Sequence, residues 1–374
     1  MNSIVPIKMP KWGLSMEEGT IVSWLKAEGA EVHEGDELLE IETAKIVNVA
    51  DAPCSGVLRR IVAQPGDVVP VGSLLGIIAD PEVSESEIND CQVAQTRDVA
   101  SGPPAEAAST LFTSTVDVGD KCLRYARVGP ETGVPIILIH GWAADLTSWL
   151  FNSDALAQHL PVYAIDLPGH GGSSKAVGTG SLSEFSQSLG AAMDVLKLDQ
   201  VHLVGHSFGG GIAARLAADR QELVRTLTLI APTHMPGGII SREFLDGVIS
   251  ASRARAMRTV LEMLLADPAS VTKEMVDDLL KYKRIDGVEE VLRLTRDRLL
   301  DDEDRIQLEE RLKELGENPK GVLIISSQTD RVISLDESAL PDGFRIHWIE
   351  GAGHLPHLEK SKEVNNLLIE RFCS

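Results

Sequence analysis

The chain of 374 residues is longer than one hydrophobic core usually supports, so two domains are expected. Its formal net charge of -21, from 35 Lys and Arg against 56 Asp and Glu, argues against nucleic acid or an anionic membrane as a partner. The four cysteines show no paired spacing, so neither a disulfide framework nor a metal site is indicated. No apolar run could form a signal peptide or membrane span. A cytoplasmic protein is therefore expected.

Residues 1–80 show the pattern of a small all-β domain, with short runs of Val, Ile and Leu separated by glycines. The pattern occurs twice. A shift of 37 positions (66 minus 29) aligns Gly29 with Gly66, and the same shift aligns apolar residues such as Leu38 and Leu75. Two similar half-sheets that pack face to face are therefore predicted.

Lys45 lies where the two halves of this repeat meet, between the apolar runs 38–41 and 46–49, and is expected at the tip of a hairpin. An exposed turn lysine is usually only a solvated charge. A hairpin tip nevertheless presents its amine to solvent, as a modifying ligase and a swinging covalent arm both require.

The same region resembles the lipoyl domains of 2-oxo acid dehydrogenase complexes, which implies a lipoyl group attached covalently to Lys45. The residues that carry the resemblance are Met9-Pro10, Gly19, Trp24, Glu34-Gly35-Asp36, Leu39-Glu40-Ile41-Glu42-Thr43, Lys45, Pro53, Ser55-Gly56 and Gly66-Asp67. Ala44 and Ile46 depart from that family, which usually has Asp before the lysine and Ala after it. Related biotinyl domains have Met on both sides of the lysine. Biotin and an unmodified lysine are therefore the alternatives to lipoate.

Residues 81–111 are rich in Glu, Ser, Ala and Pro, a composition that buries too little apolar surface to order itself, and are predicted to be a flexible acidic linker. Residues 112–374 then alternate strand-like apolar runs with helix-length segments, which indicates βαβ units and a mostly parallel sheet. The strand-like runs are Pro135–Ile139, Val162–Ile165, Val201–Val204, Thr226–Ile230, Val322–Ser326 and Ile346–Ile349.

The segment from about 235 to 312 breaks this alternation, because its apolar spacing is helical and it contains no obvious strand. An inserted helical lid over a pocket explains the pattern. A plain packing insert is the alternative.

Ser207 lies in the sequence Gly205-His206-Ser207-Phe208-Gly209, after an apolar strand and before a helical stretch. This is the pattern of a nucleophile elbow, in which small residues allow a cramped turn that lifts the serine hydroxyl above the sheet. The following helix directs its positive N-terminal dipole toward a developing oxyanion. A glycine-rich turn with a buried, inert serine is the alternative.

A serine nucleophile needs a base, and the base needs an orienting carboxylate. Two downstream residues fit: Asp330 follows the strand that ends at Ser326, and His354 follows the strand that ends at Ile349. The order Ser, Asp, His is that of α/β hydrolases. Ser207, Asp330 and His354 are therefore the predicted catalytic residues.

Several other polar residues compete for these roles. His206 adjoins the nucleophile but should point away from it and line the pocket, and His357 is interpreted as a surface polar group. His202 on the elbow strand is interpreted as a core histidine. Asp166 lies before a turn-forming stretch and is interpreted as structural.

The oxyanion hole needs two backbone N–H donors. The residue after the nucleophile, Phe208, supplies one of them. Trp142 is the candidate for the other, because His140-Gly141-Trp142 follows a predicted strand and Gly141 allows the chain to approach closely.

Residues 112–374 resemble the α/β-hydrolase superfamily in His140-Gly141, in the stretch 166–171, in the elbow and in the surroundings of Asp330 and His354. This resemblance implies a fold and a class of chemistry, not a substrate. The expected architecture is thus an all-β lipoyl domain followed by an α/β-hydrolase fold with a mostly parallel sheet and a helical lid.

The combination of the two domains resembles the acetyltransferase (E2) components of bacterial acetoin dehydrogenase systems. The resemblance implies that a dihydrolipoyl arm on Lys45 delivers an acetyl group, that Ser207 receives it and that coenzyme A accepts it. It also implies a thiamine-diphosphate-dependent E1 and a dihydrolipoamide dehydrogenase E3 as partners, with the chain expected to be a homo-oligomer in the complex. Two alternatives are a hydrolase that passes the acyl group to water and a lipoyl carrier whose second domain serves only assembly.

Overall fold

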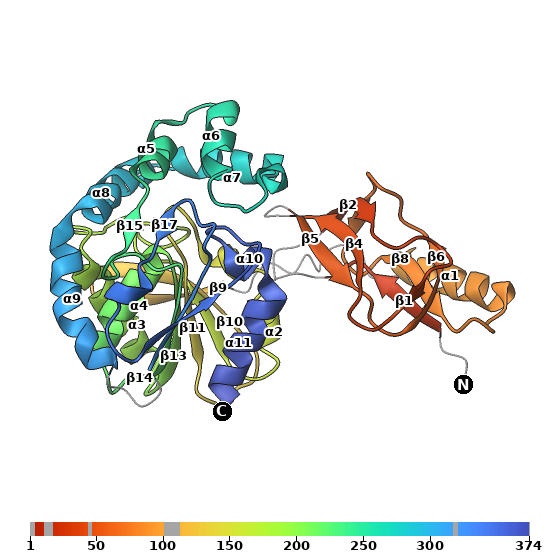
Figure 1. Cartoon of the computed structure of the whole chain (residues 1–374), viewed down its shortest axis with the longest axis horizontal. Helices are drawn as coiled ribbons and strands as arrows, with labels where there is room; N and C mark the ends of the chain where they lie inside the picture. Colours follow the sequence, from red (N-terminus) through yellow and green to blue (C-terminus); the bar gives the residue numbers. More distant parts are fainter. Residues whose placement is uncertain (1–3, 11–17, 44–46, 101–112, 317–320, 374) are drawn as a thin grey trace. The chain divides into compact units, whose positions relative to one another are not determined.

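A computed structural model describes residues 4–10, 18–43, 47–100, 113–316 and 321–373 of the chain (Figure 1). Within it the chain divides into two compact units, Met1–Leu111 and Phe112–Ser374, each with its own hydrophobic core. Among the described helices, none combines the length and the apolar character needed to cross a bilayer.

The small unit contains two four-stranded antiparallel sheets among its described residues. Their strand orders are β1 (Ile4–Lys8), β8 (Leu74–Ala79), β6 (Gly56–Ile61), β3 (Glu31–Val32) in one sheet and β5 (Val47–Asp51), β4 (Glu37–Glu42), β2 (Glu18–Trp24), β7 (Val68–Pro70) in the other. The central pairs, β2–β4 and β6–β8, are the two copies of the sequence repeat. Leu38 and Leu75, which the repeat aligns, are both fully buried in the common core. The predicted pair of similar half-sheets is confirmed.

Strands β4 and β5 pair with Glu42 opposite Val47, so residues 43–46 connect two paired strands. Thr43 is buried at the end of β4. The predicted attachment residue, Lys45, lies outside the described residues, and its position at a hairpin tip stays a prediction.

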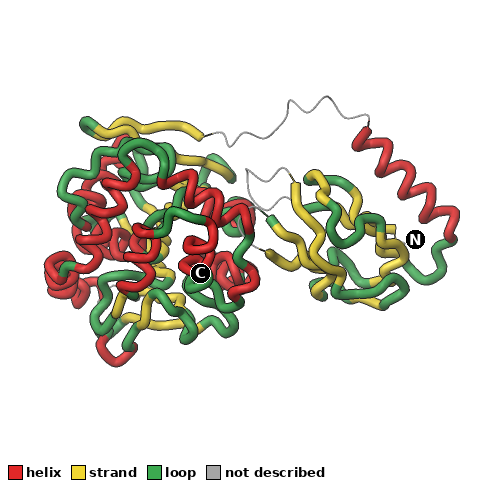
Figure 2. The backbone as a smooth tube through the Cα atoms, turned by 90° about the horizontal axis from the view of Figure 1, so that it is seen from above, coloured by secondary structure: helices red, strands yellow, loops and turns green. Residues whose placement is uncertain are grey.

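A helix occupies the first part of the segment predicted as a flexible linker. Helix α1 (Glu85–Ala100) follows the small unit, and Figure 2 shows it as the helix beside the strands of that unit. Val83 and Ile88 are buried against β8, while Arg59 and Arg60 form ion pairs with Glu85 at 2.7 and 2.8 Å. The prediction of a structureless linker is therefore wrong for residues 85–100. Two apolar side chains and a local ion-pair cluster order a segment whose average composition suggested disorder.

The large unit is built on one eight-stranded sheet within the described residues. Its strands, in spatial order, are β18 (Phe344–Trp348), β16 (Val322–Ser326), β14 (Val224–Ile230), β13 (Val201–His206), β11 (Ile136–Ile139), β12 (Val162–Ile165), β10 (Lys121–Val128) and β9 (Thr113–Val118). All neighbours from β18 to β12 are parallel, and only the β12–β10 and β10–β9 pairs are antiparallel. The predicted mostly parallel sheet is confirmed, and all six predicted strands are present. The sequence analysis missed β9 and β10.

Two layers of helices cover this sheet on opposite sides (Figure 1). One layer contains α3 (Leu182–Val195), α4 (Phe208–Asp219) and α9 (Asp302–Gly316), and the other contains α2 (Ser153–Leu156), α10 (Pro356–Glu359) and α11 (Ser361–Cys373). Both faces of the central strands are consequently buried, as a parallel sheet requires.

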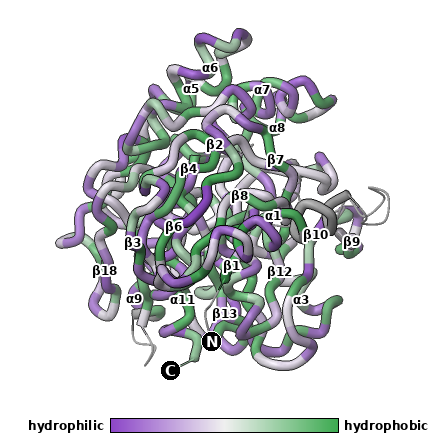
Figure 3. Tube along the Cα trace, turned by 90° about the vertical axis from the view of Figure 1, so that its right-hand side faces the viewer, coloured by the Kyte–Doolittle hydropathy of each residue, from purple (hydrophilic) through white to green (hydrophobic). Residues whose placement is uncertain are grey.

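The segment predicted as a lid is mainly helical. It contains α5 (Arg242–Ser250), α6 (Ala254–Leu261), α7 (Lys273–Lys283) and α8 (Val288–Leu300), together with a two-residue strand, β15 (Ile239–Ile240), that pairs with β17 (Ile333–Ser334). Hydrophobic and hydrophilic residues alternate along these helices, as in amphipathic helices (Figure 3). Helix α9 falls partly inside the predicted lid but packs on α4 through buried leucines, so it belongs to the layer that covers the sheet. We use the term cap for α5–α8.

Candidate active site

Ser207 lies at a strained turn between β13 and α4. Its backbone has φ 54° and ψ -118°, a left-handed conformation that non-glycine residues rarely adopt and that is enriched at functional sites. A Cβ added to Gly205 would collide with the carbonyl of Gly209, and one added to Gly209 would collide with the carbonyls of Ile139 and His140. The turn therefore requires both glycines, as the elbow pattern predicted.

Ser207, His354 and Asp330 form a continuous chain of hydrogen bonds. The His354 ring has its Nε2 atom 3.0 Å from Ser207 Oγ and its Nδ1 atom 2.8 Å from Asp330 Oδ2. Because an ionised carboxylate only accepts, Nδ1–H donates to Asp330 and Nε2 is free to accept the serine proton. The structure thus brings together three residues that are far apart in the sequence.

Asp330 is held in a fixed orientation by its own loop. Its Oδ1 atom accepts hydrogen bonds from the backbone N–H groups of Val332, at 2.7 Å, and Ile333, at 2.9 Å. Its side chain is fully shielded from solvent. The carboxylate therefore presents Oδ2 to the histidine.

The backbone of His354 is held from two sides. Its N–H donates to the carbonyl of Leu264 in the cap at 2.7 Å, and its carbonyl accepts from His206 Nε2 at 2.9 Å. The His206 ring thus connects the elbow to the loop of the base, and its predicted place along the pocket stays a prediction. Burial lowers the pKa of His206 well below its ordinary value, and the neighbouring His357 and His354 lower it further, so the ring is neutral.

Arg331 and Glu359 join the triad loops to the cap, and sequence reasoning missed both. The Arg331 guanidinium donates to the carbonyls of Glu262 and Leu265, the latter at 2.8 Å. The Glu359 carboxylate accepts from the N–H groups of Gly353 and Ala266, both at 2.7 Å. Burial raises the pKa of Glu359, although these hydrogen bonds oppose the rise. The position of Arg331 directly after Asp330 was the one available sequence signal.

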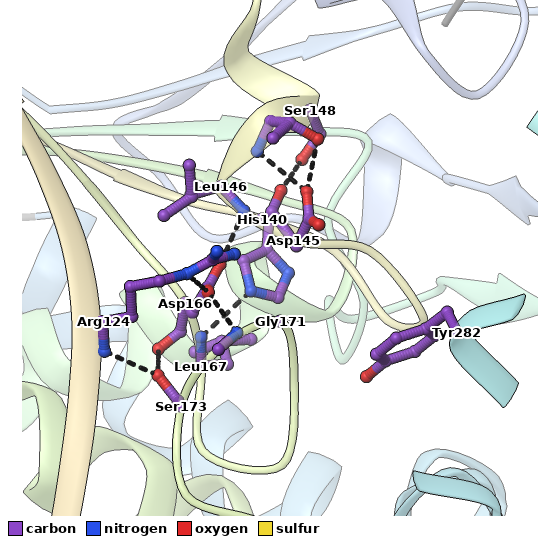
Figure 4. A network of polar contacts seen from close by, with 12 residues as sticks. Arg124, His140, Asp145, Leu146, Ser148, Asp166, Leu167, Gly171, Ser173 and Tyr282 are labelled. Carbon is purple, nitrogen blue, oxygen red and sulfur yellow. Dashed lines mark hydrogen bonds and ion pairs between the residues drawn. The ribbon is translucent and has the colours of Figure 1, made fainter. Parts of the chain in front are cut away.

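The loop after β11 is fixed by the buried ring of His140 (Figure 4). His140 Nε2 accepts from Leu167 N–H at 3.0 Å, so Nδ1 carries the proton and donates to the Gly141 carbonyl at 2.8 Å. Burial lowers the pKa of His140 to about 4, which keeps this tautomer neutral. Since a trans peptide directs its C=O and N–H in opposite directions, the bond to Gly141 also fixes the direction of the Trp142 N–H.

The two residues predicted for the oxyanion hole both lie beside the elbow. Phe208 is the first residue of α4, and a Cβ added to Gly141, the neighbour of Trp142, would lie 3.1 Å from Ser207 Cβ. The indole Nε1 of Trp142 donates to Thr295 of α8 at 2.8 Å. The cap thereby anchors the loop that carries Trp142.

Asp166 is a structural carboxylate, as expected. It accepts from Arg124 Nε at 2.5 Å, from Gly172 N–H at 2.7 Å and from Leu146 N–H at 2.8 Å (Figure 4). Burial raises its pKa, although the hydrogen bond from Arg124 opposes the rise. These contacts tie the segment after β12 to strand β10 and to the segment after β11.

Of the two other histidines considered in the sequence analysis, His202 lies where it was expected and His357 does not. His202 is a core residue, as predicted, and its Nδ1 lies 2.7 Å from Thr226 Oγ1. The interpretation of His357 as a surface group is wrong, because its side chain is fully buried between the rings of Trp149 and His206, with ring centroids 4.7 and 4.4 Å away. His357 lies in α10, and only the tertiary packing of this helix buries it.

Comparison with known proteins agrees with this architecture. The model of the α/β hydrolase family matches residues 136–367, and that of a family described as biotin-requiring enzyme matches residues 5–78. Among solved structures, the 2-hydroxy-6-oxo-6-phenylhexa-2,4-dienoate hydrolase of Rhodococcus is 20% identical with a TM-score of 0.63, and it covers 70% of this chain and 99% of its own, which shows the fold alone.

Two curated relatives align along almost the whole chain. Both are named dihydrolipoyllysine-residue acetyltransferase component of acetoin cleaving system. The relative from Pseudomonas putida is 39% identical over 99% of this chain and 98% of its own length. The relative from Cupriavidus necator is 40% identical over 98% and 96%. The chain therefore belongs to the α/β hydrolase family and, over nearly its full length, to the family of dihydrolipoyllysine-residue acetyltransferase components of acetoin cleaving systems.

Proposed function

We propose that this chain transfers an acetyl group from a dihydrolipoyl arm on Lys45 to coenzyme A, with Ser207 as nucleophile, His354 as base and Asp330 as the residue that orients the base. The observation that carries the proposal is the hydrogen-bonded chain from Ser207 through His354 to Asp330, with bonds of 3.0 and 2.8 Å. The names of the two long relatives support the acetyl transfer and the lipoyl arm.

The first half-reaction forms an acetyl-enzyme. Ser207 Oγ attacks the thioester carbonyl of the acetylated arm while His354 Nε2 takes the hydroxyl proton. The N–H groups of Phe208 and Trp142 donate to the resulting oxyanion. When the tetrahedral adduct collapses, the carbon–sulfur bond breaks and His354 returns the proton to the departing thiolate. The products are a Ser207 acetyl ester and a free dihydrolipoyl thiol.

The second half-reaction is the reverse process with a different thiol. The thiol of coenzyme A gives its proton to His354 as its sulfur attacks the Ser207 ester, and collapse of the adduct releases acetyl-CoA and regenerates the serine hydroxyl. His354 must be neutral in its Nε2-accepting tautomer at the start of both halves, which the hydrogen bond to Asp330 favours.

The lipoyl domain makes the donor partly intramolecular. A tethered arm raises the local concentration of the thioester near Ser207, so the arm needs little intrinsic affinity for the site. The proposed partners are a thiamine-diphosphate-dependent E1 that acetylates the arm and a dihydrolipoamide dehydrogenase E3 that reoxidises it. These partner assignments come to this chain from the family to which it belongs.

A quenched assay on the purified protein tests the acceptor. The lipoylated chain, with its arm acetylated chemically, is mixed with coenzyme A, and acetyl-CoA and acetate are separated by chromatography. Acetyl-CoA that requires Ser207 supports the proposal. Acetate formed at the same rate with and without coenzyme A would instead identify a hydrolase, and acetyl-CoA formed equally by Ser207→Ala would identify a carrier with an assembly-only second domain.

Intact mass and peptide mapping test the attachment site. We expect a lipoyl adduct on the peptide that contains Lys45 and none in Lys45→Arg. The variant should still use free acetyl-dihydrolipoamide as a donor, because the second domain would be unaltered. An adduct on another lysine would disprove the assignment.

A further inference from the structure

The helix α6 of the cap is a concentrated region of positive charge in a chain of net charge -21. From Gly247 to Leu261 the sequence contains Arg253, Arg255 and Arg258 and no acidic residue. None of these three arginines forms an ion pair with any other described residue, whereas most arginines of the described chain do, for example Arg215 with Asp219. The field around α6 is thus not neutralised locally.

The first part of this region is open to solvent. Ser252, Arg253 and Arg255 are exposed, while Met257 and Leu261 are buried and attach α6 to the rest of the cap. Arg258 is half-buried and donates to the carbonyl of Val271 at 2.6 Å, which fixes its position. Arg253 and Arg255 are therefore the two guanidinium groups available to a ligand.

A neighbouring helix adds positive charge to the same region. Helix α7 packs against α6, and Lys283 near its end donates to the carbonyl of Ala251, two residues before Arg253, at 2.6 Å. Two acidic residues of the surrounding cap are engaged elsewhere, with Asp277 bound to Lys273 at 2.5 Å and Asp246 bound to Arg296 at 3.3 Å. A third, Glu262, lies at the C-terminal end of α6, whereas Arg253 and Arg255 lie at its N-terminal end.

This positive region lies one short helix away from the proposed base. The turn that follows α6 contains Leu264, whose carbonyl accepts from His354 N–H at 2.7 Å. Helix α6 has 8 residues, which corresponds to a length of about 12 Å. A ligand with one end at Ser207 and a polyanionic end on α6 must therefore have a long, slender linker between the two.

We infer that Arg253 and Arg255 bind the phosphate groups of coenzyme A, while its pantetheine arm reaches along α6 to Ser207. This inference rests on the proposed function and assigns the binding site of its acceptor. Coenzyme A carries its thiol on a long pantetheine chain and its negative charge on three phosphates at the other end, which matches the separation of the two sites. Guanidinium groups bind phosphate through paired, charge-assisted hydrogen bonds.

The test compares coenzyme A with pantetheine, which has the same thiol and arm but no phosphates. The donor is free acetyl-dihydrolipoamide, so docking of the lipoyl domain does not contribute. For the double variant Arg253→Gln/Arg255→Gln we expect the KM for coenzyme A to rise by about tenfold or more, since each lost charge-assisted contact is worth up to a factor of ten. The KM for pantetheine should stay within about twofold, and Arg253→Lys/Arg255→Lys should recover part of the loss.

The double variant Arg225→Gln/Arg345→Gln is the matched control. Arg225 and Arg345 are exposed and lie near the starts of β14 and β18, at the opposite end of the sheet from the elbow, so their loss removes the same two positive charges. If the double variant showed the same ratio of the two KM values as this control, the inference would be overturned. A rise only in the KM for free acetyl-dihydrolipoamide would overturn it too, because the arginines would then act on the donor rather than on coenzyme A.

Binding measured without turnover separates this inference from the proposed function. If the wild-type protein formed no thioester with either thiol, the acyl-transfer proposal would fail. Calorimetric titration with coenzyme A would then still decide whether Arg253 and Arg255 bind its phosphates. Binding that weakens about tenfold in the double variant but not in the control supports the site. Equal binding in all three proteins refutes it.

Discussion

His357 is a buried histidine, and its environment predicts that acid destabilises the large unit. Its ring is fully buried against Trp149, and neither ring nitrogen has a hydrogen-bond partner among the described residues. Burial lowers its pKa from 6.5 to about 3. The folded state therefore keeps the ring neutral, whereas the unfolded state binds a proton as soon as the pH falls below the ordinary value.

The magnitude follows from the two pKa values. The contribution of the neutral ring is fully present above pH 6.5 and is lost progressively as the pH falls toward the folded pKa of about 3. A pH of about 5 lies roughly 1.5 units below the ordinary pKa of the histidine in the unfolded state. Protonation of the unfolded state at this pH therefore lowers the free energy of unfolding by about 2 kcal/mol. In His357→Phe this term is absent, so the loss of stability between about pH 8 and about pH 5 should be smaller by about 2 kcal/mol.

Urea unfolding of both proteins at the two pH values, followed by tryptophan fluorescence, measures this difference. Comparing the change with pH removes the packing cost of the larger phenyl ring, which acts equally at both values. Trp149→Phe is the control, since it alters the same contact but keeps the histidine, and its pH dependence should match that of the wild type. The reasoning is refuted if His357→Phe loses as much stability on acidification as the wild type does.

Three further predictions concern the proposed acyl transfer. Asp330→Asn should lower kcat by about a thousandfold or more, because the amide cannot hold His354 in the required tautomer. A stopped assay with acetyl-dihydrolipoamide measures this fall in kcat, and an unchanged rate would exclude Asp330 as the orienting residue. Gly209→Ala should abolish activity, since its Cβ would meet the carbonyls of Ile139 and His140, and circular dichroism should show that the protein still folds; full activity would mean that the elbow relaxes. His206→Phe should lower kcat by about tenfold with little change in KM, because it removes the donor to the His354 carbonyl; a change confined to KM would indicate a pocket residue instead.

The elements that the sequence predicted correctly are those whose signals are local. Six apolar runs became strands of the parallel sheet, because strands buried on both faces read as continuous apolar stretches. The edge strands β9 and β10 escaped notice because they are partly exposed and polar residues interrupt their apolar pattern. Helix α1 escaped notice because an average composition hides the effect of two buried side chains, Val83 and Ile88.

The sequence by itself determined the residue types and order of the candidate site: an elbow around Ser207, then an acid, then a histidine at the ends of successive strands. Short motifs of this kind depend on backbone geometry within a few residues, so they can be read from the chain directly. The tertiary structure alone decided which side chains support them. The bond from His206 to the His354 carbonyl, the connection of Arg331 and Glu359 to the cap and the burial of His357 join segments far apart in sequence. Their positions follow from the packing of the sheet, the cap and the final helices, which no local pattern encodes.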